Sequence, residues 1–112
     1  MKIYHNPRCK KSRAGLAYLE EKTKDFELIN YIKEGISKEE LKEIISKTGL
    51  SAEELLRKQE DAYKKEIKGK KLSDAELIKA IADNPKLLKR PIIINGAKAV
   101  WADPPENINN IL

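Results

Sequence analysis

The sequence has 112 residues, 23 of them basic and 18 acidic, so its formal charge at pH 7 is +5. A chain of this length typically forms one domain with its own hydrophobic core. One cysteine and one histidine exclude an internal disulfide and a cysteine- or histidine-rich metal site. No apolar run approaches the roughly 20 residues of a membrane helix, and no signal-peptide pattern follows Met1. We therefore expect a monomeric, cytoplasmic protein with no membrane partner.

The basic excess is carried mainly by lysine, since 19 lysines stand beside only four arginines. Most lysines are interspersed with glutamates, as in residues 38–43, which is typical of a solvated helix surface. The one basic cluster, residues 64–71, lacks the interleaved aromatic side chains that single-strand binders use. We therefore expect no nucleic-acid partner. Because the chain uses arginine so rarely, the four arginines indicate positions that need the planar guanidinium group, which can form two parallel hydrogen bonds.

The first part of the chain predicts a strand, a helix and a second strand. Residues 2–5 contain β-favouring Ile and Tyr, and the Asn-Pro pair that follows marks a turn. Apolar residues at helical spacing predict a helix over residues 12–22. Residues 26–32 alternate imperfectly between apolar and polar side chains and predict the second strand.

Three helix starts in the middle of the chain share one signature, a serine followed three residues later by a glutamate. In this capping box the two side chains satisfy backbone N–H groups of the first turn, and an apolar pair flanks each box as a hydrophobic staple. The boxes predict helices over residues 38–47, 52–60 and 74–83. Residues 63–71 are polar and predict a loop with at most a short helical turn.

The end of the chain returns to β structure. Residues 91–94 and 99–102 predict two strands joined by an Asn-Gly turn, the typical signal of a tight hairpin. Residues 106–112 predict a final helix. The order β-α-β, a helical stretch, then β-β-α predicts an α/β fold with a mixed sheet covered by helices.

Cys9, the only cysteine, stands between the first strand and the first helix. A helix N-terminus presents free N–H groups and a partial positive charge, which favour an anion. Four cationic residues lie within four positions of Cys9: Arg8, Lys10, Lys11 and Arg13. Both effects favour the thiolate, the reactive form of cysteine. We therefore interpret Cys9 as a reactive thiolate beside an oxyanion-binding loop rather than as a small buried apolar residue.

Because the chain has no second cysteine, an oxidised or derivatised sulfur must be resolved by a thiol from another molecule. Ser12 stands where a CxxC motif has its second cysteine. We expect its side chain to cap the helix or to hydrogen-bond the Cys9 sulfur. His5 is expected to donate a hydrogen bond or hold positive charge near the thiolate, the alternative being a strand-end histidine without a role.

Residues 3–13, Ile-Tyr-His-Asn-Pro-Arg-Cys-Lys-Lys-Ser-Arg, resemble the active-site segment of the glutaredoxin-coupled arsenate reductases, a thioredoxin-fold family that includes the Spx-like regulators. The resemblance continues through residues 55–58 and 88–93. It implies a thioredoxin-like mixed sheet of β-α-β…β-β-α order. It also implies a single domain over residues 1–112, with a helical insertion over residues 34–86 between the second strand and the C-terminal hairpin.

The resemblance further implies a reaction. Cys9 matches the family's nucleophile, which attacks arsenate and forms a thiol–arsenate adduct. Glutathione then attacks the adduct, and glutaredoxin regenerates the thiol as arsenite is released. A small oxyanion is thus the implied substrate, glutathione the co-substrate and glutaredoxin the partner, with no bound cofactor or metal.

Other site residues are carried over by position. His5, Ser12 and Arg13 match catalytic positions that line the oxyanion loop. Arg57 and Arg90 match two of the family's three anion-binding arginines, and we expect them to affect the titration of Cys9 less than the binding of the oxyanion. Pro91 matches the fold's cis-proline, which an X–Pro bond adopts at modest cost.

Asp103 stands where the third arginine is expected. A carboxylate would repel an arsenate dianion, and losing one charge-assisted contact costs about 1.5–3 kcal/mol. Lys98 or a lysine of residues 64–71 is the expected substitute, as a point charge without the guanidinium fork.

Three functions follow from these residues. The first is reduction of arsenate to arsenite through Cys9 with external glutathione and glutaredoxin. The second is a glutathione-dependent thiol reductase of the same family without arsenate activity, which Asp103 motivates. The third is an Spx-like regulator that binds RNA polymerase, although Ser12 excludes a dithiol switch.

Overall fold

The four strands form one mixed sheet in the order β2-β1-β3-β4 in the computed structural model, which describes residues 1–112. β1 (Lys2–His5) is parallel to β2 (Glu27–Asn30) and antiparallel to β3 (Ile92–Asn95), which pairs with β4 (Lys98–Trp101) in an antiparallel hairpin. The sheet and its helices form the thioredoxin-like α/β fold that the sequence predicts.

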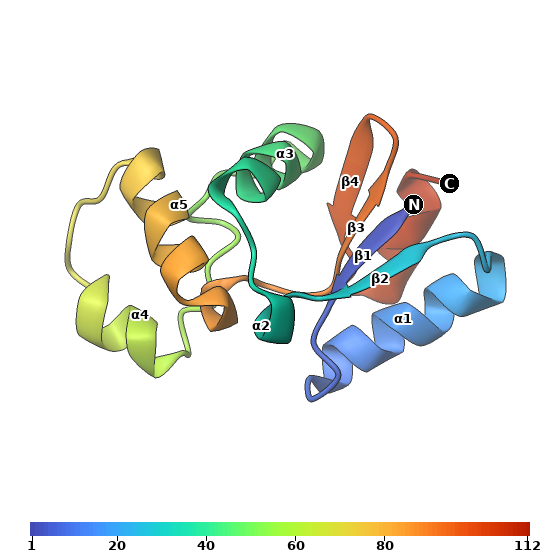
Figure 1. The fold of residues 1–112 in the computed structure, drawn as a ribbon, viewed down its shortest axis with the longest axis horizontal. Helices are drawn as coiled ribbons and strands as arrows, with labels where there is room; N and C mark the ends of the chain where they lie inside the picture. The colour runs from blue at the N-terminus through green and yellow to red at the C-terminus, as the bar shows by residue number, and fades with distance from the viewer.

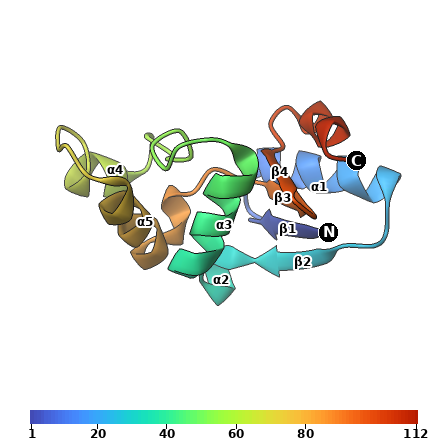
Figure 2. The same ribbon diagram turned by 90° about the horizontal axis from the view of Figure 1, so that it is seen from above.

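The alternation of side chains along β1 and β3 divides the core into two parts. Ile3 and Ile93, which are register partners, face α1 (Lys10–Lys22) and the 3₁₀ helix η2 (Pro105–Asn110). Tyr4 and Ile92 face the opposite side, where the larger cluster includes apolar residues of α3 (Lys38–Thr48) and α5 (Asp74–Asp83). Successive strand residues point to opposite faces, so the short strands bury both faces of the sheet. Figures 1 and 2 show α1 on one side of the sheet and α3 on the other.

After α3, the helical segment between β2 and β3 extends away from the sheet (Figure 1), and the molecule measures 40 Å along its longest axis. The helices between β2 and β3 are, in chain order, α2 (Tyr31–Glu34), α3 (Lys38–Thr48), α4 (Asp61–Glu66), α5 (Asp74–Asp83) and the 3₁₀ helix η1 (Pro85–Leu87). The division into a single domain over residues 1–112 with an insertion over residues 34–86 stays a prediction. None of the helices is both long and apolar enough to cross a membrane.

The capping signals were correct for two of the three predicted helices. Ser37 and Glu40 form a complete capping box at the start of α3, and Gly49 ends that helix in the left-handed conformation with φ 73°. A second complete box starts α5, which ends at Asp83 as predicted. These boundaries depend on contacts within a few residues, which is why the sequence alone predicts them.

The predicted helix over residues 52–60 is wrong. The box of Ser51 and Glu54 forms, with N···O distances of 3.0 and 3.1 Å, but only turns follow it. Instead, the Arg57 N–H donates to the Leu87 carbonyl at 2.7 Å, and the Lys89 N–H donates to the Leu55 carbonyl at 2.9 Å. This antiparallel bridge between distant segments takes the backbone groups that a helix would use.

Smaller differences lie at element ends. α1 begins at Lys10 rather than at residue 12, and the predicted second strand ends at Asn30, whose side chain caps α2. The region predicted as a loop over residues 63–71 contains the end of α4, and the predicted final helix is the 3₁₀ helix η2.

Gly15 of α1 leaves the space in which Pro91 packs, because a Cβ at Gly15 would lie 2.4 Å from Pro91 Cγ. We predict that Gly15→Ala lowers the free energy of unfolding by about 1–3 kcal/mol through overpacking, although alanine favours a helix over glycine by about 1 kcal/mol. Urea unfolding measures the change. Ala17 is exposed in the same helix, so Ala17→Gly measures the difference in helix propensity between alanine and glycine without a change in packing. A Gly15→Ala protein more stable than the parent would contradict this packing.

Candidate active site

Cys9 is the N-cap residue of α1 and is partly exposed. Its N–H donates to the Asn6 carbonyl at 3.0 Å, and its carbonyl accepts from the Arg13 N–H at 3.0 Å. The turn after β1 therefore closes onto the first turn of α1. The side chain of Cys9 makes no capping bond, which leaves the free N–H groups of this turn to an anion.

The pKa of Cys9 is lower than that of an ordinary cysteine. Burial is the largest influence and raises it, but hydrogen bonding from the Ser12 backbone N–H, from the Arg90 side chain and from the Lys11 backbone N–H outweighs burial, and the Arg90 charge adds to this. The sequence attributed the effect to the helix start and to four local cations. The helix start does lower the pKa of Cys9, through the backbone N–H groups of Ser12 and Lys11. The side chains of the four local cations are not among the main causes, and the charge that lowers this pKa belongs to Arg90.

His5 and Ser12 form a buried network behind the loop. The Ser12 hydroxyl accepts from the Asn6 N–H at 3.0 Å and lies 2.7 Å from His5 Nδ1. Burial, the largest cause, lowers the pKa of His5 and so disfavours the positive charge that the sequence offered as one role for this ring. The Ser12 side chain supports the loop, and its backbone N–H is the group that stabilises the sulfur.

Arg13 also holds the loop, since its Nη1 donates to the Pro7 carbonyl at 2.9 Å. Its side chain is exposed and crosses the turn from the first turn of α1. Arg13 therefore lies beside the loop, where the sequence placed it. The Pro7 carbonyl already accepts a hydrogen bond from one nitrogen of its guanidinium.

Arg90 is 7% exposed and directly precedes Pro91 at the start of β3, with a cis bond between them. Its Nη1 donates to the carbonyls of Lys86 at 3.0 Å and Leu88 at 3.3 Å, while its buried Nε has no partner. Arg90 thus lowers the pKa of Cys9, and the expectation that it affects oxyanion binding more than the titration of Cys9 stays a prediction.

Arg57 and Arg90 line one small cavity of about 80 Å³. Arg57 is held by Glu60, whose Oε2 lies 3.1 Å from both Nε and Nη2 of the guanidinium. The bridge between residues 55–57 and 87–89 brings the two arginines together. The remaining lining residues are Lys11, Gln59, Lys89 and Trp101.

Asp103 lies at the site, but it is paired. Its Oδ2 is 3.1 Å from Lys11 Nζ, which belongs to the first turn of α1. The cation that sequence reasoning missed is Lys89, whose Nζ lies 4.6 Å from the centre of the Trp101 ring. Lys89 directly precedes Arg90 in the sequence, and this adjacency could have indicated that Lys89 lies near the site. Lys98 begins β4 opposite Asn95 at the hairpin turn, so it does not line this cavity.

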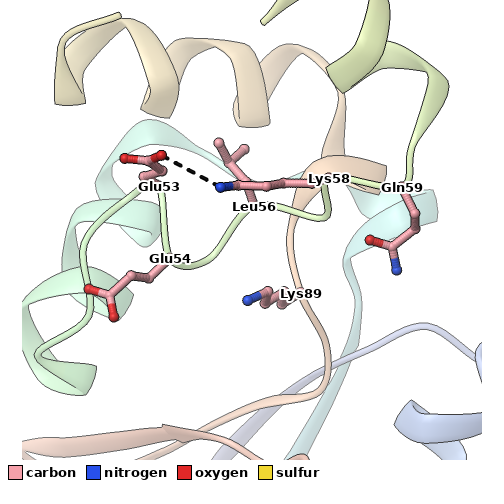
Figure 3. Close-up of a pocket in the computed structure, with 6 residues that line it drawn as sticks. All are labelled: Glu53, Glu54, Leu56, Lys58, Gln59 and Lys89. Carbon is pink, nitrogen blue, oxygen red and sulfur yellow. Dashed lines mark ion pairs between the residues drawn. The ribbon is translucent and has the colours of Figure 1, made fainter. Parts of the chain in front are cut away.

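A second hollow, of about 460 Å³, adjoins the small cavity and shares Lys89 and Gln59 with it (Figure 3). Its Lys58 pairs with Glu53 at 3.6 Å, and neither Cys9 nor an arginine lines it. No three His, Cys, Asp or Glu side chains gather into a possible metal site. The reactive groups therefore belong to Cys9 and the small cavity.

The chain matches the ArsC family over residues 4–111. It is 43% identical to an arsenate reductase of Neisseria meningitidis serogroup A, covering 100% of this chain and 97% of the relative. It is 40% identical to the uncharacterised protein YfgD of Escherichia coli K12, over 100% of this chain. The solved arsenate reductase of Vibrio cholerae superposes with a TM-score of 0.93 at 40% identity, covering 100% of this chain and 98% of that one.

These likenesses and the sheet order place the chain in the class of thioredoxin-like proteins with a cysteine at the start of the first helix. Within that class the protein is a member of the ArsC family, to which arsenate reductases belong.

We predict that removing the Arg90 charge raises the pKa of Cys9. In the wild type the rate of alkylation by iodoacetamide should rise with pH around a midpoint below the ordinary value of about 8.5, because only the thiolate reacts. Arg90→Met should shift that midpoint upward. Arg57→Met is the matched control, since Arg57 is not among the causes of the Cys9 shift. Identical midpoints in the Arg90→Met protein and the wild type would contradict the assignment.

Proposed function

We propose that the protein is an oxidoreductase that reduces arsenate to arsenite through Cys9, with glutathione and glutaredoxin as external thiols. The observation that carries the proposal is the position of Arg90, which stabilises the Cys9 thiolate and also lines the small cavity with Arg57. An oxyanion in that cavity would give the unpartnered Arg90 Nε an acceptor. The similarity to curated arsenate reductases supports this substrate.

The first step is attack by the Cys9 thiolate on arsenic. A bond forms between sulfur and arsenic, and one arsenate oxygen leaves as water after protonation. The backbone N–H groups at the start of α1 favour negative charge there. Arg57 and Arg90 hold the remaining oxygens, and Glu60 keeps the Arg57 guanidinium in place through its two 3.1 Å contacts.

The second step needs a thiol from outside, because Cys9 is the only cysteine. A glutathione thiolate attacks the Cys9 sulfur, and the sulfur–arsenic bond breaks with its electron pair remaining on arsenic. Arsenic is thereby reduced by two electrons and leaves as arsenite, while Cys9 and glutathione become a mixed disulfide. A further thiol, supplied by glutaredoxin or glutathione, restores Cys9.

A second candidate function is reduction of glutathione mixed disulfides without arsenate turnover. The ion pair of Lys11 and Asp103 favours this second function. Asp103 brings a negative charge to the site, and its pairing with Lys11 takes up a positive charge that would otherwise bind the oxyanion. Such a reaction would use Cys9 and external glutathione in the same way and would require no arsenate in the small cavity.

We predict that the purified protein, mixed with glutathione, glutaredoxin, glutathione reductase and NADPH, oxidises NADPH when arsenate is added. The absorbance of NADPH follows the reaction, and arsenite is quantified directly. Cys9→Ser should abolish this turnover, because a serine hydroxyl is not ionised at neutral pH. Turnover of a glutathione mixed disulfide with no arsenite formed would support the second candidate instead, and equal rates for Cys9→Ser and wild type would sink both.

We predict that Asp103→Asn raises kcat/KM for arsenate about fivefold, equivalent to about 1 kcal/mol. The substitution removes a repulsive carboxylate and frees Lys11 for the anion. Glu106→Gln is the matched control, since it removes the same charge from an exposed position of η2. An unchanged or lower kcat/KM for Asp103→Asn would show that the Lys11–Asp103 pair supports the active loop instead.

A further inference from the structure

A third cavity, of about 640 Å³, is lined in part by Asn6, Pro7 and Arg8, the residues that directly precede Cys9. Arg90 lines both this cavity and the small one, while Arg8 lines the large one and Lys11 the small one. Cys9 stands between Arg8 and Lys11 in the chain. Organic ligands typically occupy pockets of roughly 300–1,000 Å³. The small cavity thus suits an inorganic oxyanion, and the large one suits an organic molecule that approaches the same sulfur. We call the large cavity the Arg8 groove.

The Arg8 groove is strongly cationic. Arg8, Lys33, Lys86 and Arg90 line it, and Glu60 is its only carboxylate. Glu60 is already engaged by the Arg57 guanidinium, so its charge is largely compensated. The four cations come from separate elements: the loop after β1, α2, η1 and the segment before β3. The fold has therefore gathered positive charge around a cavity beside the nucleophile.

We propose that the Arg8 groove binds the thiol co-substrate, a small peptide thiol that carries more carboxylates than ammonium groups. This inference rests on the proposed function, which requires an external thiol at Cys9 and uses glutathione. Glutathione has two carboxylates and one ammonium group, so its net charge complements the groove. Lys33 and Lys86 bind its carboxylates, and Arg8 and Arg90 hold the end nearest to the sulfur.

The groove also explains how the mixed disulfide is resolved. The glutathionyl group joined to Cys9 leaves the small cavity free, and the incoming thiolate attacks the glutathionyl sulfur. A new disulfide forms between the two glutathione molecules, the bond to Cys9 breaks, and the electron pair leaves on Cys9 as a thiolate. That leaving group is favoured because the Cys9 thiolate is stabilised by Arg90 and by the helix start.

The test prepares the mixed disulfide of Cys9 with 2-thiopyridine, an uncharged group that brings no carboxylate to the groove, and measures the second-order release of 2-thiopyridone from Cys9 by glutathione and by 2-mercaptoethanol. In the double variant Lys33→Gln, Lys86→Gln the rate with glutathione should fall roughly 5- to 30-fold, which is the effect of two exposed charge contacts. The rate with uncharged 2-mercaptoethanol should stay unchanged. Both lysines are exposed and their side chains make no ion pair, so the variant keeps the folding contacts.

Lys64→Gln, Lys65→Gln is the matched control, because it removes the same charge from exposed positions of α4 that do not line the groove. It should react as the wild type does with both thiols. A direct measurement uses S-methylglutathione, which cannot react, and follows the amide signals of Lys33 and Lys86 by NMR. These signals should shift in the wild type, and the dissociation constant should rise in the double variant by a similar factor.

The outcomes separate this inference from the proposed function. Wild-type rates with glutathione in the double variant would refute the groove while leaving Cys9 chemistry intact. An equal loss with glutathione and with 2-mercaptoethanol would also refute it, since a binding site for carboxylates cannot slow an uncharged thiol. A wild-type protein that forms no mixed disulfide at Cys9 would overturn both the groove and the proposed function.

Discussion

The interaction on which the site depends is the approach of the Arg90 guanidinium to the Cys9 sulfur. A buried guanidinium is costly unless its charge and its N–H groups are compensated. Arg90 is 7% exposed, donates through Nη1 to two neutral carbonyls and leaves Nε without a partner. An anionic sulfur offsets this buried positive charge, and the guanidinium in turn lowers the pKa of the thiol.

Arg90 lines two cavities, and the two ligands of the proposed reaction are assigned to different ones. The one that Arg57 lines is small and suits the oxyanion, while the larger one lies beside Arg8 and is proposed for the thiol. The ion pair of Arg57 and Glu60 connects the two cavities, because Arg57 lines the small cavity and Glu60 lines the Arg8 groove. A nucleophile between two anion sites can pass from one partner to the other without leaving its stabilising charges.

The negative charge of Asp103 is the feature that sets this site apart from the arrangement that the family resemblance implies. Its pairing with Lys11 places a carboxylate next to a cation of the small cavity. Lys89, held near the Trp101 ring, supplies a positive charge from the other side. If this cavity binds the dianion as proposed, these two lysines and one carboxylate change the positive charge that Arg57 and Arg90 supply there.

The sequence by itself determined what depends on neighbours in the chain: β1, the hairpin of β3 and β4, the capping boxes of α3 and α5, and Cys9 at the start of α1. Its motifs also indicated Arg57 and Arg90 as anion-binding residues, a role that stays a prediction, and the structure places both at one small cavity. Only the tertiary structure decided that residues 52–60 are not helical, since their backbone groups bond to the segment before β3. The same pairing brought Arg57 beside Arg90. Local signals cannot reveal it, because its partners come from distant segments and their energies compete with those of a helix.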